Sequence, residues 1–337
     1  MVGKRKRLLA TCAALCVAGA VIYLAVAALD RGEATTDAGP LAGPPVGLES
    51  AGLMARAVDR ADRGSDGRLL ALAGGRPRPL EGELSCERVY YAGGRGLCLA
   101  GTGGGGSEVT IFDSAMRPSK TLPLSGLPSR ARVSADGRYG ATTVFVDGHA
   151  YEKPGGFSTV TTLYDMHSGT ELGSLEEFEV RKNGRRFEAV DFNFWGATFS
   201  RANPDRFYAT LHTGPHYYLV EGSVFSRTLR VLRDGVECPS LSPDGTRIAF
   251  KSRLARDRWR LRVLDLDTLK DHPVAERRSI DDQAEWLDDS TLVYSDGLDL
   301  YAAPADGSGA SRLILRNASS PVSLSVGLEP RRKPGAP

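Results

Sequence analysis

The chain has 337 residues, of which 41% are apolar and 25% are charged, a composition typical of a globular body with a sizeable core. Its formal net charge is +2, from 43 basic and 41 acidic side chains, and four of the basic ones stand together as KRKR in residues 4–7. The rest of the chain is therefore nearly neutral. Because a phosphate backbone demands a basic face, we expect no nucleic-acid partner.

The N-terminus predicts a membrane segment. Residues 8–29 carry no charge and follow a short basic segment, residues 1–7. As a helix they would be roughly 33 Å long, enough to cross a hydrocarbon core of about 30 Å. The basic segment favours a cytoplasmic N-terminus, so we expect a single-pass signal-anchor in the cell membrane and an extracytoplasmic body.

Two alternatives for this segment stay open, and both export the body. Cleavage after Ala27, within the AVA of residues 25–27, would release a secreted protein. Residues 9–12 (LATC) loosely resemble a lipobox, in which Cys12 would carry a lipid. Cleaved signals usually have a shorter apolar stretch, of about 7–15 residues, which favours the uncleaved anchor.

The segments on either side of the body are polar. Residues 30–48 are rich in Gly and Pro and are expected to form a flexible linker. Residues 327–337 are expected to be a disordered tail. Residues 49–326 remain for the folded body.

A repeated hairpin motif runs through the body. Its clearest copy is CPSLSPDGTRIAF in residues 238–250, a short strand, a Pro-Asp-Gly turn and a second strand. Residues 131–142 repeat it around Asp136 and Gly137. Looser copies centre on residues 92–94, 203–205 and 288–289. Asp-Gly and Gly-Gly supply the positive φ that tight turns need, so each copy predicts a hairpin.

The spacing of the turns predicts a propeller. The turns are about 44, 68, 40 and 45 residues apart, and further strands follow each hairpin, as at residues 161–165 and 259–265. Four strands every 40 to 45 residues or so is the repeat of a propeller blade. The longest interval holds a charged insertion, residues 176–189, which we expect to project from one face.

A sixth copy is split between the two ends of the body. Residues 53–58, 68–73 and 77–84 predict three strands with no first strand before them, and residues 318–324 resemble residues 237–242. We therefore predict an all-β, six-bladed β-propeller whose first blade is closed by residues 318–324 lying beside the strand near Met54. Closing the ring removes free strand edges. Five or seven blades remain alternatives.

These motifs carry a family resemblance over about residues 50–325. SPDGTRIAF and SADGRYGATT resemble the propeller repeats of TolB-like translocation proteins, and SCERVYYAGGRGLCLA, NFWGATF and DDQAEWLDD are similar to membrane-anchored members in high-GC bacteria. The resemblance implies a non-catalytic propeller that binds a protein or peptide partner in the cell envelope. TolB itself has an α/β domain ahead of its propeller, which residues 30–50 are too short to supply, so the partners of that domain do not carry over.

Polar residues stand at the predicted start of each innermost strand. Because these strands surround the axis, their starts meet at one mouth of the channel, where we predict a site for a peptide or a small polar ligand. Solvation alone also requires polar residues at such a mouth. The candidates are Glu87, Arg88, Arg130, Asp191, Asn193, Glu237, Asp281, Asp282 and Gln283.

No motif of an enzyme stands out, and we expect neither a cofactor nor catalysis. The alternative is a propeller hydrolase or lactonase with a metal ion in the channel, held by residues such as Asp191, Asp281 and Asp282. His212 and His216 flank a turn and are expected to be solvated rather than metal ligands.

The cysteines and tryptophans of the body are expected to be structural. We expect Cys86, Cys98 and Cys238 to be buried free thiols, because the inferred register offsets the first two by about two residues. A disulfide between Cys86 and Cys98 remains the alternative. Trp195 and Trp286 are expected to pack between blades.

Overall fold

The computed structural model describes residues 36–37, 44–59, 66–102, 106–146 and 158–324. The predicted signal-anchor, the predicted tail and much of the predicted linker lie outside these residues. No helix within the described ranges has the length and apolar character needed to span a membrane. The described residues from Asp37 onward belong to one compact unit.

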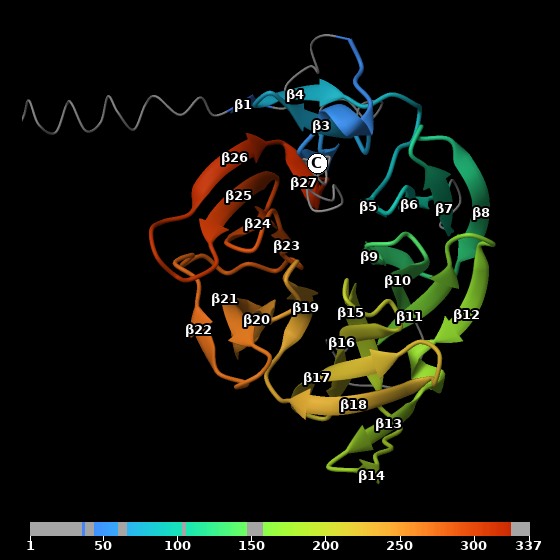
Figure 1. Ribbon diagram of the computed structural model, residues 1–337, viewed down its shortest axis with the longest axis vertical. Coiled ribbons are helices and arrows are strands. Elements are labelled where there is room, and N and C mark those ends of the chain that lie inside the picture. The colour runs from blue at the N-terminus through green and yellow to red at the C-terminus, as the bar shows by residue number, and fades with distance from the viewer. Residues whose placement is uncertain (1–35, 38–43, 60–65, 103–105, 147–157, 325–337) are drawn as a thin grey trace, which may run out of the picture. The chain divides into compact units, whose positions relative to one another are not determined.

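Six sheets surround a central axis, each running from an innermost strand beside the axis to an outermost strand at the rim (Figure 1). From inside to outside, blade 1 consists of β27 (Ala318–Ser323), β2 (Leu53–Ala57), β3 (Leu69–Ala73) and β4 (Arg76–Pro79). Blade 2 consists of β5 (Arg88–Ala92), β6 (Arg95–Gly101), β7 (Ser107–Asp113) and β8 (Pro118–Leu124). Blade 3 consists of β9 (Leu127–Val133), β10 (Tyr139–Val146), β11 (Ser158–Asp165) and β12 (Thr170–Ser174).

The other three blades have the same plan. Blade 4 consists of β15 (Asn193–Phe199), β16 (Arg206–Thr213), β17 (His216–Ser223) and β18 (Thr228–Arg233). Blade 5 consists of β19 (Glu237–Leu241), β20 (Arg247–Ala255), β21 (Arg258–Asp265) and β22 (Asp271–Pro273). Blade 6 consists of β23 (Glu285–Trp286), β24 (Thr291–Asp296), β25 (Asp299–Pro304) and β26 (Arg312–Arg316). Short elements outside this plan are β1 (Thr36–Asp37), β13 (Glu179–Lys182), β14 (Arg185–Arg186) and the 3-10 helices η1 (Leu48–Ser50) and η2 (Leu175–Glu177).

The C-terminal strand closes the ring, as predicted. β27 pairs antiparallel with β2, placing Met54 opposite Val322 and Arg56 opposite Ser319. Figure 1 shows this C-terminal strand beside the N-terminal blade. The pairing covers the edge that β2 would otherwise expose to other chains. The body is thus an all-β propeller of six blades, rather than five or seven.

The predicted hairpin turns are present. The Gly93-Gly94 turn joins β5 to β6, the turn at Gly137 joins β9 to β10, and all three glycines have positive φ. A Cβ at position 93 would overlap the main chain of Asp136 and Gly137. The turns of blades 2 and 3 therefore pack directly on each other, and Gly93 is required by close approach as well as by φ.

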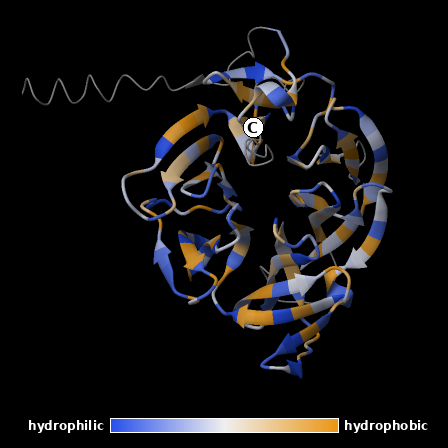
Figure 2. Ribbon diagram, in the orientation of Figure 1, coloured by the Kyte–Doolittle hydropathy of each residue, from blue (hydrophilic) through white to orange (hydrophobic). Residues whose placement is uncertain are grey.

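The core lies between neighbouring blades. Leu97, Leu99 and Ile111 of blade 2 are almost fully buried and pack in one cluster with Ala131 and Val133 of β9. Figure 2 shows hydrophobic residues alternating with hydrophilic ones along the strands, as expected for sheets packed face to face. Each blade thus buries apolar side chains against the next.

Trp195 and Trp286 are buried, and Trp286 has the predicted packing role between blades. Trp195 is 5% exposed and its ring lies against His212 and Tyr217. Trp286 is 2% exposed, and its Nε1 donates a hydrogen bond to the Ser240 carbonyl at 2.9 Å. The hydrogen bond from Trp286 ties blade 6 to blade 5.

The end of the predicted linker contacts blade 1. The Val46 N–H donates to the Pro79 carbonyl at 3.0 Å, and Val46 forms a parallel bridge with Leu80. Leu48 is 5% exposed and belongs to the core cluster of this blade. Residues 44–48 thus differ from the flexible linker expected there, because two apolar side chains within the Pro-rich segment bind it to the body.

The charged insertion extends a sheet. β13 pairs in parallel with β18 and antiparallel with β14, which adds two strands to the outer edge of blade 4 (Figure 1). Phe178 and Val180 are buried in the core cluster of this blade. The insertion was expected to project from one face; the apolar residues between its charges instead anchor it at the rim.

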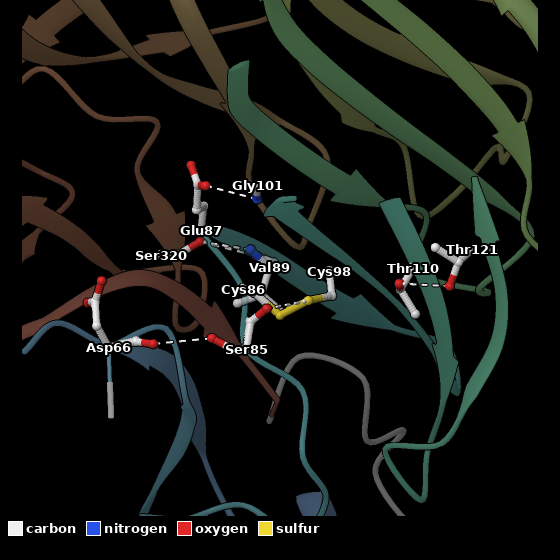
Figure 3. The surroundings of a disulfide bond; sticks show 10 residues. All are labelled: Asp66, Ser85, Cys86, Glu87, Val89, Cys98, Gly101, Thr110, Thr121 and Ser320. Atoms are coloured by element: carbon white, nitrogen blue, oxygen red, sulfur yellow. Dashed lines mark hydrogen bonds between the residues drawn. A yellow bond between two sulfur atoms is a disulfide. The ribbon is translucent and has the colours of Figure 1, made fainter. Parts of the chain in front are cut away.

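The expectation of free thiols is wrong for one pair. Cys86 and Cys98 form a disulfide, with their Cα atoms 5.3 Å apart (Figure 3). The expected offset assumed that Cys86 lies within the hairpin, but β5 begins at Arg88. The Cys86 N–H donates to the Gly67 carbonyl at 2.8 Å, so the chain bends before the strand and Cys86 reaches Cys98. Cys238 is a buried free thiol, as expected.

Candidate functional site

The predicted channel mouth contains a cavity of about 230 Å³, here called the start-side cavity because it lies where the innermost strands begin. Its walls come from β5, β9, the segment before β23, the end of β24 and β27. It brings together five of the nine predicted residues: Arg88, Arg130, Asp281, Asp282 and Gln283.

Two guanidinium groups lie at this cavity without a carboxylate partner at ion-pair distance in the described part of the chain. Arg88 donates from Nε to the Ser129 carbonyl at 2.7 Å and from Nη1 to the Glu87 carbonyl at 3.1 Å. Arg130 donates from Nη1 to the same Ser129 carbonyl at 2.8 Å. Both side chains therefore keep unused N–H groups, since each guanidinium has five.

The two carboxylates opposite them differ. Asp281 pairs with the Lys251 ammonium, which is only 4% exposed. Asp282 accepts a hydrogen bond from the Ser295 N–H at 2.9 Å and has no ion pair to a described residue. Asp282 is therefore the carboxylate still available to a ligand.

Burial and mutual charge set the electrostatics of this group. Burial lowers the pKa of Arg88, the Arg130 charge lowers it further, and Asp282 opposes both. Burial likewise acts to lower the pKa of Arg130, but Cys238 and the two carboxylates outweigh it and raise the value. Burial acts to raise the pKa of Asp281, and the Lys251 ammonium overcomes it and holds that pKa below its usual value. The two like-charged guanidinium groups thus destabilise each other and favour an anion between them.

Gln283 lines the cavity but mainly joins blades. It is 4% exposed, and its Nε2 donates to the carbonyls of Gly196, Ala197 and Pro239. These carbonyls belong to blades 4 and 5, so the side chain ties three blades at the axis. Its Oε1 is buried and has no hydrogen-bond partner.

The other four predicted residues hold local structure instead of lining this cavity. The Glu87 carboxylate accepts from the Gly101 N–H at 2.9 Å (Figure 3), and Asp191 accepts from the Gly214 N–H at 2.7 Å. Asn193 Oδ1 accepts from the Thr159 N–H at 2.8 Å. Glu237 pairs with Arg253 at 2.9 Å and accepts from Trp259 Nε1 at 3.0 Å. Each satisfies a turn or a neighbouring strand.

A larger cavity, of about 400 Å³, lies where the innermost strands end, and is here called the end-side cavity. Residues from all six innermost strands line it, so it is centred on the axis. Its larger side chains include Tyr90, Tyr91, Arg132, Phe199, Arg201 and Trp286. The prediction from the sequence rested on strand starts and did not include this cavity. The aromatic residues just before three of the hairpin turns, Tyr90 with Tyr91, Phe199 and Trp286, were the available signal.

A buried polar network lies between the two cavities. Arg132 and Glu285 pair at 3.4 Å with side-chain exposures of 9% and 6%, and Arg132 lines both cavities. The Tyr90 hydroxyl donates to Glu285 Oε1 at 3.0 Å. Burial raises the pKa of Tyr90, and the Glu285 charge raises it further. The network fixes the innermost strands of blades 2, 3 and 6 relative to one another.

Arg201 is the cation of the end-side cavity that remains available. It is exposed, and it makes no hydrogen bond or ion pair with any residue that the structure describes. Partial desolvation of the guanidinium by neighbouring groups lowers its pKa, which Tyr90 and acidic neighbours oppose. An acidic group entering this cavity would therefore meet an unpaired guanidinium beside aromatic rings.

The metal alternatives gain no support from the geometry. Within the described ranges, no group of three or more His, Cys, Asp or Glu side chains is placed to hold a metal ion. His212 stacks on Tyr217 with ring centroids 4.6 Å apart, and His216 bonds to Asp234. Asp191 caps the turn at Gly214 and does not line the cavity of Asp281 and Asp282.

Comparisons with known proteins define the class by fold. No protein-family model and no curated protein matches the chain. Among solved structures, TolB from Acinetobacter baumannii matches with a TM-score of 0.57 at 14% identity, over 84% of this chain and 68% of that one. A chain of the nidogen/laminin complex matches with a TM-score of 0.52 at 8% identity, over 80% of this chain and 97% of that one.

The fold is that of a six-bladed propeller, and it is shared with TolB. The TolB-like propeller expected from the sequence is therefore confirmed at the level of the fold. The putative TolB of Agrobacterium tumefaciens is also similar, with a TM-score of 0.49 at 14% identity over 80% of this chain and 90% of that one.

Proposed function

We propose that this chain is a non-catalytic propeller that binds a protein or peptide partner in the bacterial cell envelope. The observation that carries the proposal is the end-side cavity, which collects side chains from all six innermost strands on the propeller axis. Tyr91 offers aromatic surface there, and Arg201 offers an unpaired cation. Aromatic residues and Arg are the types that dominate binding energy at protein interfaces.

The rigidity of the site supports recognition of a flexible segment. The Arg132–Glu285 pair and the Tyr90 hydroxyl fix three blades at the base of the cavity. A preformed cavity lowers the entropy that binding costs, because only the incoming segment must be ordered. The fold shared with TolB is consistent with this role, although the same fold hosts many activities.

The envelope location is part of the proposal. The uncharged residues 8–29 would anchor the chain in the cell membrane with residues 1–7 in the cytoplasm; cleavage after Ala27 would secrete it instead. Either way the propeller is extracytoplasmic. The Cys86–Cys98 disulfide supports this placement, because such bonds persist mainly in oxidising compartments.

Site-specific photo-crosslinking in intact cells tests the proposal. A benzophenone amino acid in place of Tyr91 lies in the end-side cavity, whereas the same replacement of Phe225, which is 90% exposed and lines neither cavity, is the matched control. We expect a discrete covalent adduct from position 91 and none from position 225. In the chain that carries the benzophenone amino acid at position 91, Arg201→Ala should lower the yield of the adduct. Adducts only from position 225, or from neither position, would contradict the proposed site.

A further inference from the structure

The start-side cavity has a net positive charge that nothing in the described structure neutralises. Arg88, Arg130 and Lys251 face Asp281 and Asp282, and Lys251 is already paired with Asp281. Two guanidinium groups thus remain against a single carboxylate. The other charged residues of the lining are paired elsewhere, Arg132 with Glu285 and Asp296 with Arg278 at 2.9 Å.

Buried polar atoms in the lining also lack partners. Arg130 Nε, Gln283 Oε1 and Ser295 Oγ are buried, and none has a hydrogen-bond partner in the described part of the chain. A buried polar atom without a hydrogen-bond partner destabilises the fold, so this set is unfavourable unless something polar occupies the cavity. One is a donor, one an acceptor, and the serine hydroxyl can be either.

The shape and the remaining lining limit the size and polarity of the occupant. A volume of about 230 Å³ equals roughly seven or eight water molecules at about 30 Å³ each. Hydroxyl groups are frequent around it, from Ser279, Ser295, Ser319 and Ser320. Such a lining suits a compact molecule with several hydroxyl groups and a single anionic group.

We propose that the start-side cavity binds a small hydroxylated carboxylate, such as a sugar acid, with the carboxylate held by Arg88 and Arg130 and a hydroxyl donating to Asp282. One carboxylate neutralises the excess positive charge, and a guanidinium is well suited to bind it because its planar N–H groups match two carboxylate oxygens. The remaining hydroxyl groups satisfy Gln283 Oε1 and the serines. This site lies at the opposite end of the axis from the proposed partner site and does not depend on it.

The test compares three probes on the purified full-length chain by isothermal titration calorimetry. Gluconate carries a carboxylate and hydroxyls, sorbitol has the same carbon skeleton with an alcohol in place of the carboxylate, and acetate has the carboxylate alone. We expect saturable binding of gluconate, with sorbitol and acetate weaker by at least about tenfold. Equal binding of sorbitol and gluconate, or no saturable binding of gluconate, would overturn the proposal.

Variants then assign the residues. Arg88→Ala and Arg130→Ala should each weaken gluconate binding by at least about tenfold, and Asp282→Asn should weaken gluconate while leaving acetate unchanged. Arg201→Ala, in the end-side cavity, is the matched control and should bind gluconate normally. Arg130→Lys, which keeps the charge but loses the planar donor pair, serves if Arg130→Ala fails to fold by circular dichroism. Equal losses from Arg201→Ala and Arg88→Ala would refute the assignment.

Discussion

Glu276, in the segment between β22 and β23, is an anion held by its neighbours. Its side chain is 3% exposed, and its Oε1 accepts from Arg278 Nε at 2.9 Å and its Oε2 from the Tyr294 hydroxyl at 2.8 Å. Burial acts to raise its pKa, but the hydrogen bonds from Arg278 and Tyr294 overcome burial and hold the pKa at about 2, below the usual 4.5. The folded chain therefore binds fewer protons here than the unfolded chain between these two values.

This difference predicts how stability changes in acid. The contribution of Glu276 is present above about pH 4.5 and is lost as the pH falls towards about 2, by up to about 3 kcal/mol at 1.36 kcal/mol per pKa unit. Chemical denaturation at several pH values measures the free energy of unfolding. This free energy should fall less steeply with decreasing pH for Glu276→Gln than for the unmodified chain. Glu171→Gln, at an exposed position, is the control. Identical pH profiles for Glu276→Gln and the unmodified chain would rule this contribution out.

The candidate site shows what single residues in the sequence could and could not predict. Arg88, Arg130 and Asp282 were predicted to converge because strand starts in a propeller share one mouth. Glu237 and Asp191 stand at equivalent positions, but their partners Arg253 and Thr213 come from other strands, which no single motif reveals. Arg88, Arg130 and Asp282 remain available to a ligand because the described part of the fold gives them no ion pair.

At the scale of elements, the hairpins were predictable because their turns carry Gly and Asp at the positions that need them. The place of the charged insertion, residues 176–189, could not be predicted, because the parallel pairing of β13 with β18 joins segments nearly 50 residues apart. The disulfide was missed for a similar reason, because the bend at Cys86 depends on Gly67 of the preceding blade.

The Gly93-Gly94 turn allows a controlled test of packing between blades. Both residues have positive φ, but a Cβ at 93 overlaps the next blade, whereas a Cβ at 94 meets nothing within 4 Å. Gly94→Ala should cost about 1–2 kcal/mol from backbone strain, and Gly93→Ala a further 1–3 kcal/mol or so from overpacking. Denaturant unfolding of both variants measures the difference. Equal costs would mean that the two turns do not touch.

The disulfide predicts a response to reductant. Its two cysteines are 12 residues apart, and closing a loop of that size contributes about 3 kcal/mol to stability. Reduction should lower the free energy of unfolding by about this amount in the unmodified chain. It should leave the Cys86→Ser, Cys98→Ser double variant unchanged. Non-reducing peptide mapping that finds both thiols free would disprove the bond.

At the scale of the whole molecule, both cavities exist because the ring is closed. Ser319 and Ser320 of β27 line the start-side cavity, and Ser323 lines the end-side cavity. The closure was predictable from the resemblance of residues 318–324 to residues 237–242, together with the missing first strand of blade 1. The end-side cavity could not be predicted from the sequence, because residues of all six blades form its lining.

Disulfide trapping across the closure tests this architecture most directly. Leu53 and Ser323 are opposite each other. The Leu324 N–H donates to the Gly52 carbonyl at 3.1 Å, so Leu53 and Ser323 form a non-hydrogen-bonded antiparallel pair. The Cα atoms of such a pair lie close enough for a disulfide. The account predicts that Leu53→Cys with Ser323→Cys forms a crosslink, found by peptide mapping, while Leu53→Cys with Arg312→Cys of β26 does not. A crosslink in the second pair alone, or in neither, would contradict the closed six-bladed ring.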